Sequence, residues 1–153
     1  MPKLWSAAVA AALLITLFSA DARAGSVNET YGVGIKGYDP VAYFTDKKPV
    51  MGSATHTFVY EGVTYRFASA DHQKLFSKDP TKYLPEFGGF CPYGTAVGRK
   101  VDIDPASWSI VHGKLYPNYN MDVLGTWRKD KPGYIHKAEE NWPEVSQQTD
   151  VIH

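Results

Sequence analysis

The residue whose chemistry most needs an explanation is Cys91, the single cysteine of the chain. It lies in the segment EFGGFCPYG, between two aromatic residues and next to glycines, and Pro92 follows it directly. A thiolate binds soft or borderline metal ions and attacks electrophilic carbon. If a helix begins at Pro92, Cys91 occupies its cap, where the helix dipole lowers the pKa of the thiol. The alternative is simple burial, because free cysteine is among the most buried residue types.

The second candidate is His72, in the segment ASADHQKLFSK. In a helix, His72, Leu75 and Phe76 share one face, and the two apolar residues are expected to point inward. His72 would then point inward too, in the first turn, where the positive end of the helix disfavours the imidazolium form. A neutral imidazole in such a place can ligate a metal, act as a base, or form a hydrogen bond in the core.

Three hypotheses remain open for these two residues. In the first, Cys91 and His72 bind copper or zinc without catalysis; two ligands from one chain are too few, so a protein partner or an organic ligand would supply another. In the second, the chain is an enzyme with Cys91 as nucleophile and His72 as base. In the third, the cysteine is purely structural and the protein binds a small ligand or a partner elsewhere.

Other possible ligands or catalytic groups are weaker. His112 is expected in a hairpin turn, His56 just before a strand, and Met51 in a loop. The carboxylates form no convincing acid–base pair. The chain has no phosphate-binding loop, no Gly-x-Ser-x-Gly and no His-Glu-x-x-His segment.

The elements that would position these residues follow from local patterns. Asp39-Pro40 predicts a helical turn over residues 40–44. Glu61-Gly62 and His112-Gly113 each sit between alternating apolar segments, which predicts two antiparallel hairpins. Helices are expected over 70–78, 80–83, 121–129 and 132–142, the last ended by Pro143. The sequence therefore predicts an α+β domain, with a small sheet of two hairpins packed against several short helices.

The N-terminal residues 1–24 have the pattern of a cleavable secretory signal. Lys3 precedes a short apolar run, and Ala22-Arg23-Ala24 places small residues two apart before a cut after Ala24. About a dozen apolar residues are too few for a bilayer, which needs roughly 20. We therefore expect a periplasmic or secreted protein with no stable membrane anchor after cleavage.

The remainder divides into a single domain, residues 25–145, and a polar tail, residues 146–153, that is expected to be loose. After removal of the signal, the chain has 14 basic and 15 acidic residues. No basic surplus is present to favour nucleic acid or an anionic membrane as a partner. The 10 Tyr, 7 Phe and 4 Trp residues indicate a well-packed globule.

Part of the chain resembles a known family. The segment GVTYRFASADHQKLFSKDPTKYL resembles the YHS domain, whose core reads Tyr-x-Phe-Cys-Ser-x-x-Cys, then Phe, then Asp-Pro-x-x-Tyr. The segments GYDPVAYF and WSIVHGKLYPNYN resemble the exported, stand-alone branch of that family. The resemblance extends from about Gly37 to Trp142. The positions in register are Tyr65, Phe67, Ser69, Phe76, Asp79, Pro80 and Tyr83.

The resemblance implies metal binding, because the YHS family is related to small cysteine-rich metal-binding modules. Ala68 and His72 stand where the family has its two cysteines. A zinc site of four cysteines, or of three cysteines and a histidine, is therefore impossible within one chain. What the resemblance leaves is a copper or zinc site built on Cys91 and His72.

Overall fold

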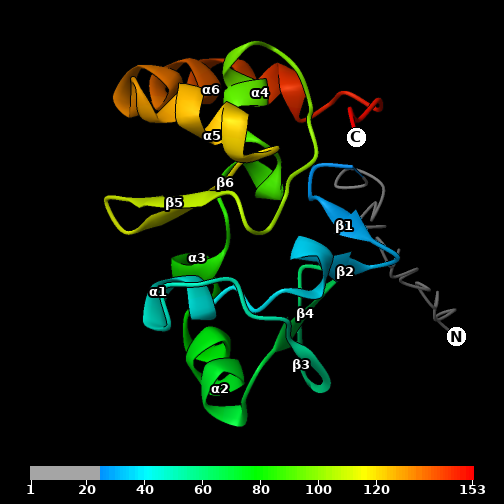
Figure 1. Cartoon of the computed structure of the whole chain (residues 1–153). Helices are drawn as coiled ribbons and strands as arrows, with labels where there is room; N and C mark the ends of the chain where they lie inside the picture. Colours follow the sequence, from blue (N-terminus) through cyan, green and yellow to red (C-terminus); the bar gives the residue numbers. More distant parts are fainter. Residues whose placement is uncertain (1–24) are drawn as a thin grey trace, which may run out of the picture.

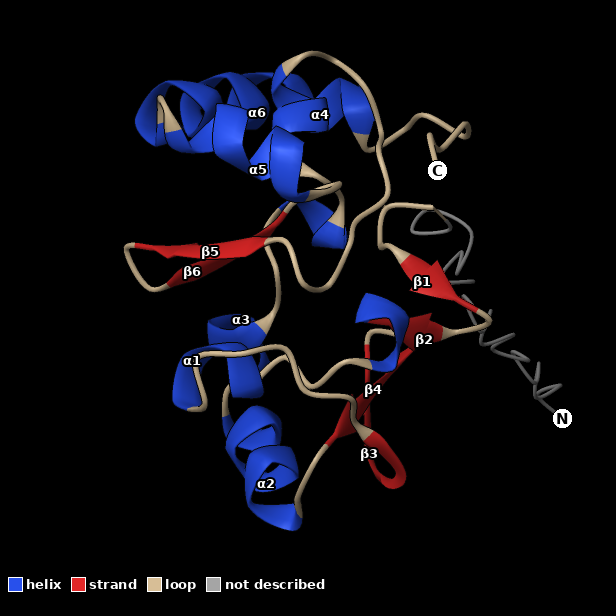
Figure 2. Ribbon diagram, viewed as in Figure 1, coloured by secondary structure: helices blue, strands red, loops and turns tan. Residues whose placement is uncertain are grey.

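The computed structural model describes residues 25–153, so the predicted signal peptide lies outside the described residues. The strands are β1 (Glu29–Thr30), β2 (Val33–Gly34), β3 (Ser53–Tyr60), β4 (Val63–Phe67), β5 (Trp108–Val111) and β6 (Lys114–Pro117). The helices are α1 (Ala42–Thr45), α2 (Ala70–Lys78), α3 (Pro80–Tyr83), α4 (Pro92–Ala96), α5 (Met121–Arg128) and α6 (Lys131–Val145). Two short 3₁₀ segments, η2 (Ile35–Gly37) and η3 (Phe87–Gly89), complete the order. The predicted α+β class is confirmed (Figures 1 and 2).

The strands form two separate sheets. One has the order β1-β2-β4-β3, with antiparallel hairpins at its two ends and a parallel pairing of β2 with β4. The other is the antiparallel pair β5–β6 alone. Both predicted hairpins are present. The hairpin β1–β2, its parallel pairing with β4, and the separation into two sheets were not predicted.

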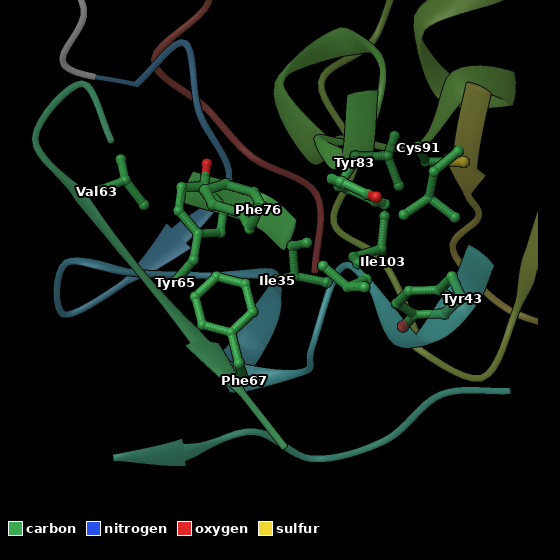
Figure 3. Packing of buried hydrophobic residues seen from close by; sticks show 12 residues of the cluster. Ile35, Tyr43, Val63, Tyr65, Phe67, Phe76, Tyr83, Cys91 and Ile103 are labelled. Carbon is green, nitrogen blue, oxygen red and sulfur yellow. The ribbon is translucent and has the colours of Figure 1, made fainter. Parts of the chain in front are cut away.

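The hairpin β5–β6 divides the interior into two hydrophobic cores. Leu115 belongs to one core, which includes residues of β4 and α2 together with Cys91 and is drawn in Figure 3. Trp108 and Ile110 pack against this core. Val111 and Tyr116, on the opposite face of the hairpin, pack in a second core with α5 and α6. In Figure 1 the hairpin accordingly lies between the group α4–α6 and the group α1–α3. Side chains alternate across a strand, so this short sheet serves both cores.

The helices begin largely where they were predicted to begin. The side chain of Ser69 accepts a hydrogen bond from the His72 N–H at the start of α2, and Asn120 caps α5 in the same way. The expectation that Leu75 points inward is wrong, because it is 39% exposed, whereas Phe76 is fully buried. Helix α6 continues through Pro143 to Val145. Val145 is 1% exposed, and its burial supports this last turn beyond the predicted end.

The C-terminal tail is docked on the domain, contrary to the expectation of a loose segment. Ile152 forms backbone hydrogen bonds with Lys100 and Asp102. The ammonium group of Lys100 is buried and donates to the carbonyl oxygens of Gly25, Ser146 and Gln148. An ammonium buried without such acceptors would be very costly, so Lys100 holds both ends of the described chain in place.

None of the helices among residues 25–153 combines the length and the apolar character needed to cross a bilayer.

Candidate ligand-binding site

Cys91 caps α4, as predicted, but its thiol is in an inert setting. The side chain is fully buried, its sulfur accepts a hydrogen bond from the Gly94 N–H, and the thiol lies 3.6 Å from Asn118 Oδ1. Burial raises the pKa of Cys91, and backbone hydrogen bonds to the sulfur offset this only in part. The expectation of a lowered thiol pKa is therefore wrong: desolvation outweighs the cap position.

The glycines before Cys91 have a packing role. A side chain on Gly88 would collide with the carbonyl oxygen of Ser26, since an added Cβ would lie 2.0 Å from it. The Gly88 carbonyl accepts a hydrogen bond from the Asn28 N–H. The Gly88-Gly89 pair thus lets the N-terminal segment pass close to the cysteine segment.

His72 is held by a buried carboxylate. Its Nδ1 lies 2.6 Å from Oδ2 of Asp39, which is fully buried and also accepts hydrogen bonds from the N–H groups of Val41, Ala42 and Ala68. Its Nε2 lies 3.2 Å from Thr45 Oγ1. Asp39 thereby fixes the imidazole and connects α1, β4 and α2.

Within residues 25–153, no hydrogen bond joins Cys91 to His72, and the two side chains share no hydrogen-bond partner. The same part of the chain has no group of three or more His, Cys, Asp or Glu residues that could hold a metal ion. His112 lies in the β5–β6 turn, as predicted. The metal pair Cys91 and His72 stays a prediction that this geometry does not support.

The series Thr45, His72 and Asp39 has the residue types of a hydroxyl–imidazole–carboxylate relay, but its surroundings do not suit catalysis. Thr45 is the last residue of α1, the carbonyl end of a helix. An oxyanion formed there would face the negative end of the helix and not the N–H groups that stabilise it. The series is better explained as a structural network.

A cleft lies where the N-terminal hairpin meets the C-terminal tail. We call it the terminal cleft. It has a volume of about 660 Å³. Its lining residues are Thr30, Tyr31, Val33, Lys36, Gly37, Arg66, Asp102 and His153. A volume of this size is in the range of small-molecule sites, roughly 300–1,000 Å³.

Of the two basic side chains that line the terminal cleft, Lys36 is paired with a carboxylate and Arg66 is not. Asp102 accepts hydrogen bonds from Lys36 (2.7 Å), Asn28 and the Ile103 N–H, and His153 lies 3.3 Å from it. Burial acts to raise the pKa of Asp102, but these hydrogen bonds outweigh it and lower the pKa to about 2. Asp102 is therefore ionised at neutral pH and offsets Lys36. Arg66, the other cation, makes no side-chain hydrogen bond or ion pair within residues 25–153.

The backbone beside the terminal cleft is strained. Tyr31, Ile35 and Lys36 all have φ near +50°, a region that costs non-glycine residues roughly 1–2 kcal/mol each. For Ile35, a β-branched residue, this conformation is a genuine outlier. The Tyr31 side chain is also fully exposed. Strain concentrated beside a cleft is a reason to suspect a functional site there.

Sequence reasoning missed the terminal cleft. Its residues come from four separate segments, and the pairing of β2 with β4 that assembles them has no local signal. The available sign was the Tyr31-Gly32 pair, because a turn of this kind usually has Asn or Asp before the glycine.

Comparison with known proteins adds no assignment: no family model, curated protein or solved structure matches the chain. The resemblance to the YHS domain stays a prediction.

The burial of Cys91 predicts a thiol that is unreactive in the folded state. We expect iodoacetamide to alkylate the native protein at least 100-fold more slowly than the urea-unfolded protein, across pH 7–9, because the raised pKa and full burial suppress the exposed thiolate. Mass spectrometry of timed samples measures the rate. Fast alkylation of the native protein would instead support the nucleophile hypothesis.

Asp102 predicts a defined loss of stability in acid. Its pKa is lower in the folded state than the unfolded value of 3.8, so the carboxylate stabilises the fold above pH 4 and this contribution disappears as the pH falls toward 2. After allowing for solvent screening, we expect a loss of about 1–2 kcal/mol. Urea unfolding at pH 2–6 measures it. Asp102→Asn should be destabilised at pH 6 and show a flatter profile below pH 4; an unchanged profile would contradict this role.

Proposed function

We propose that this protein is a non-catalytic binding protein for a small organic carboxylate that carries a flat ring, and that the terminal cleft is its site. The observation that carries the proposal is an unneutralised Arg66 beside a fully exposed, backbone-strained Tyr31 in one cleft. An arginine guanidinium binds a carboxylate through two parallel hydrogen bonds. An exposed aromatic ring offers a face on which a planar ligand stacks.

The balance of charge favours a ligand with one negative charge. Asp102 offsets Lys36 through their 2.7 Å ion pair, which leaves Arg66 as the available cation. A multiply charged anion would meet the Asp102 carboxylate as well as Arg66, and that repulsion would weaken its binding. Val33 and the ring of Tyr31 supply apolar surface for the rest of the ligand.

The chemistry of the terminal cleft favours binding over catalysis. Asp102 has a pKa of about 2 and its oxygens are occupied by hydrogen bonds, so it makes a poor general base near pH 7. Cys91 is fully buried and does not line this cleft. A periplasmic or secreted location, expected from residues 1–24, would suit a protein that collects a small nutrient or signal molecule.

A test of the proposal uses benzoate as the probe, with benzyl alcohol and benzylamine as neutral and cationic comparison compounds of similar size. We expect benzoate alone to shift the NMR signals of Tyr31 and Arg66 in a saturable manner. Arg66→Gln should weaken benzoate binding at least tenfold, because the paired hydrogen bonds are lost. The matched control is Arg99→Gln, which removes an exposed arginine outside the cleft.

Equal binding of benzoate and benzyl alcohol would contradict the proposal, as would equal losses in Arg66→Gln and Arg99→Gln.

The strained backbone at Tyr31 lowers the stability of the fold, while its exposed ring is proposed to bind the ligand. Tyr31-Gly32 forms the two-residue turn of β1–β2 with φ of 52° and 79°, a conformation in which asparagine is favoured. We expect Tyr31→Asn to raise the free energy of unfolding by about 0.5–1 kcal/mol while weakening benzoate binding. Urea unfolding and NMR titration measure the two effects.

The control is His112→Asn, at the equivalent position of the β5–β6 turn, with φ of 49°. It should leave benzoate binding unchanged. A Tyr31→Asn protein that binds benzoate as tightly as the wild type would show that the tyrosine ring is no part of the site.

A further inference from the structure

A second groove lies between strand β5 and helix α5, on another part of the molecule from the terminal cleft. We call it the β5–α5 groove; its volume is about 340 Å³. Trp108, Ser109 and Ile110 line it from the strand, Leu124 and Arg128 from α5, and Lys131 from the start of α6. None of the residues considered for chemistry in the sequence lies in it.

One wall of the β5–α5 groove is an open strand edge. Strand β5 pairs with β6 and with no other strand among the described residues. Val111 and Lys114 flank the two-residue turn, so the alternating pattern of an antiparallel pair directs the N–H and C=O groups of Trp108 and Ile110 away from β6. Within residues 25–153, no backbone or side-chain hydrogen bond from outside the hairpin reaches β5.

The opposite wall carries two available cations. Arg128 makes no side-chain hydrogen bond or ion pair within the described residues, and the Lys131 ammonium has only a distant ring contact, 6.0 Å from the centre of Trp127. No Asp or Glu is among the residues that line the groove. The groove therefore presents two positive charges that its own walls do not neutralise.

Ser109 adds a polar group between these walls. The residue is 7% exposed, and its hydroxyl has no hydrogen-bond partner among residues 25–153. Ser109 and Val111 are two residues apart on β5, so their side chains lie on the same face of the strand. Val111 packs against the second core, which includes α5, and Ser109 therefore faces α5. The Ser109 hydroxyl is not one of the fully buried, unpartnered side-chain atoms of the described residues, so it can take a hydrogen bond from a ligand in the groove.

We infer that the β5–α5 groove binds an extended acidic segment of a partner protein, which adds as a strand to the free edge of β5 and places a carboxylate on Arg128 and Lys131. The outward N–H and C=O groups of Trp108 and Ile110 are two residues apart. They match a ligand that has acceptors and donors at the same spacing, and an extended peptide has these groups. The two cations require negative charge. Strand β5 has four residues, so the added strand would be about as short.

A second copy of this chain is a poor occupant. Pairing β5 with β5 of another copy would bring two sets of Arg128 and Lys131 to the same seam, and the like charges would repel. A small organic anion would satisfy the cations but leave the strand edge unpaired. The acidic peptide satisfies both walls.

The test begins with a display library of random hexapeptides selected on the folded protein. We expect enrichment of Asp and Glu together with β-branched residues. The best peptide is then synthesised with single N-methyl groups along its backbone. Because N-methylation removes one hydrogen-bond donor at a time, affinity should fall at least tenfold at alternate positions and little at the positions between them. Only the peptide is changed in this experiment, so a loss of affinity cannot result from misfolding of the protein.

Protein variants then test the cations. Arg128→Gln and Lys131→Gln should each weaken peptide binding at least fivefold, while Lys129→Gln, an exposed lysine of the same segment outside the groove, should leave it unchanged. Peptide binding should shift the amide signals of Trp108 and Ile110 in NMR spectra. Failure to enrich any acidic peptide, an affinity indifferent to N-methylation, or glutarate binding as tightly as the peptide would each overturn the inference.

Discussion

The fold depends on a two-stranded sheet that contacts a hydrophobic core on each face. An isolated hairpin is marginally stable in water, and among residues 25–153 no further strand pairs with β5–β6; Pro85 adds a single bridge to Leu115. It is stabilised by what packs against it: Leu115 is fully buried in the first core, and its neighbour Tyr116 is 3% exposed in the second. Because the two cores share this hairpin, disturbance of either one reaches the other. The two cores cover the faces of the hairpin, and the outer edge of β5 stays unpaired within residues 25–153. The β5–α5 groove lies along this edge.

Two charged residues of one segment, Lys100 and Asp102, hold the two ends of the described chain in place. Lys100 donates to three carbonyl oxygens, and Asp102 accepts from Asn28, Lys36 and its own neighbour. Both groups are buried and have their hydrogen bonds satisfied, which is the condition under which a buried charge is tolerated. One consequence is a docked C-terminal tail. The other is a terminal cleft whose walls, from distant parts of the sequence, are held together by Asp102.

The parts of the fold that the sequence predicts are those decided by nearest neighbours. The turns at Glu61-Gly62 and His112-Gly113 and the caps at Ser69 and Asn120 depend on a few adjacent residues, and all are present. The parallel pairing of β2 with β4 and the docking of the tail depend on residues far apart, which no local pattern encodes. Leu75 shows the same limit: periodicity indicates an apolar face, but the neighbours available decide how much of it is covered.

The candidate sites also depend on contacts between residues far apart in the sequence, which local patterns do not predict. The sequence predicts an inward direction for His72 and leaves burial of Cys91 as one of two alternatives, and neither statement identifies the partner that the side chain meets. Asp39, a helix cap in sequence terms, turned out to be the partner of His72, and Asn118 the partner of Cys91. Arg66 gave no signal, because a lone arginine is an ordinary surface residue, and Tyr31 gave only the weak signal of a tyrosine before a turn glycine. Arg66 is distinguished by having no side-chain partner within residues 25–153, and Tyr31 by its left-handed backbone; both properties arise when the chain has folded. A chain that is close to neutral overall can thus leave local positive charge unneutralised, and both proposed sites rest on such charge and not on the rarity of a residue type.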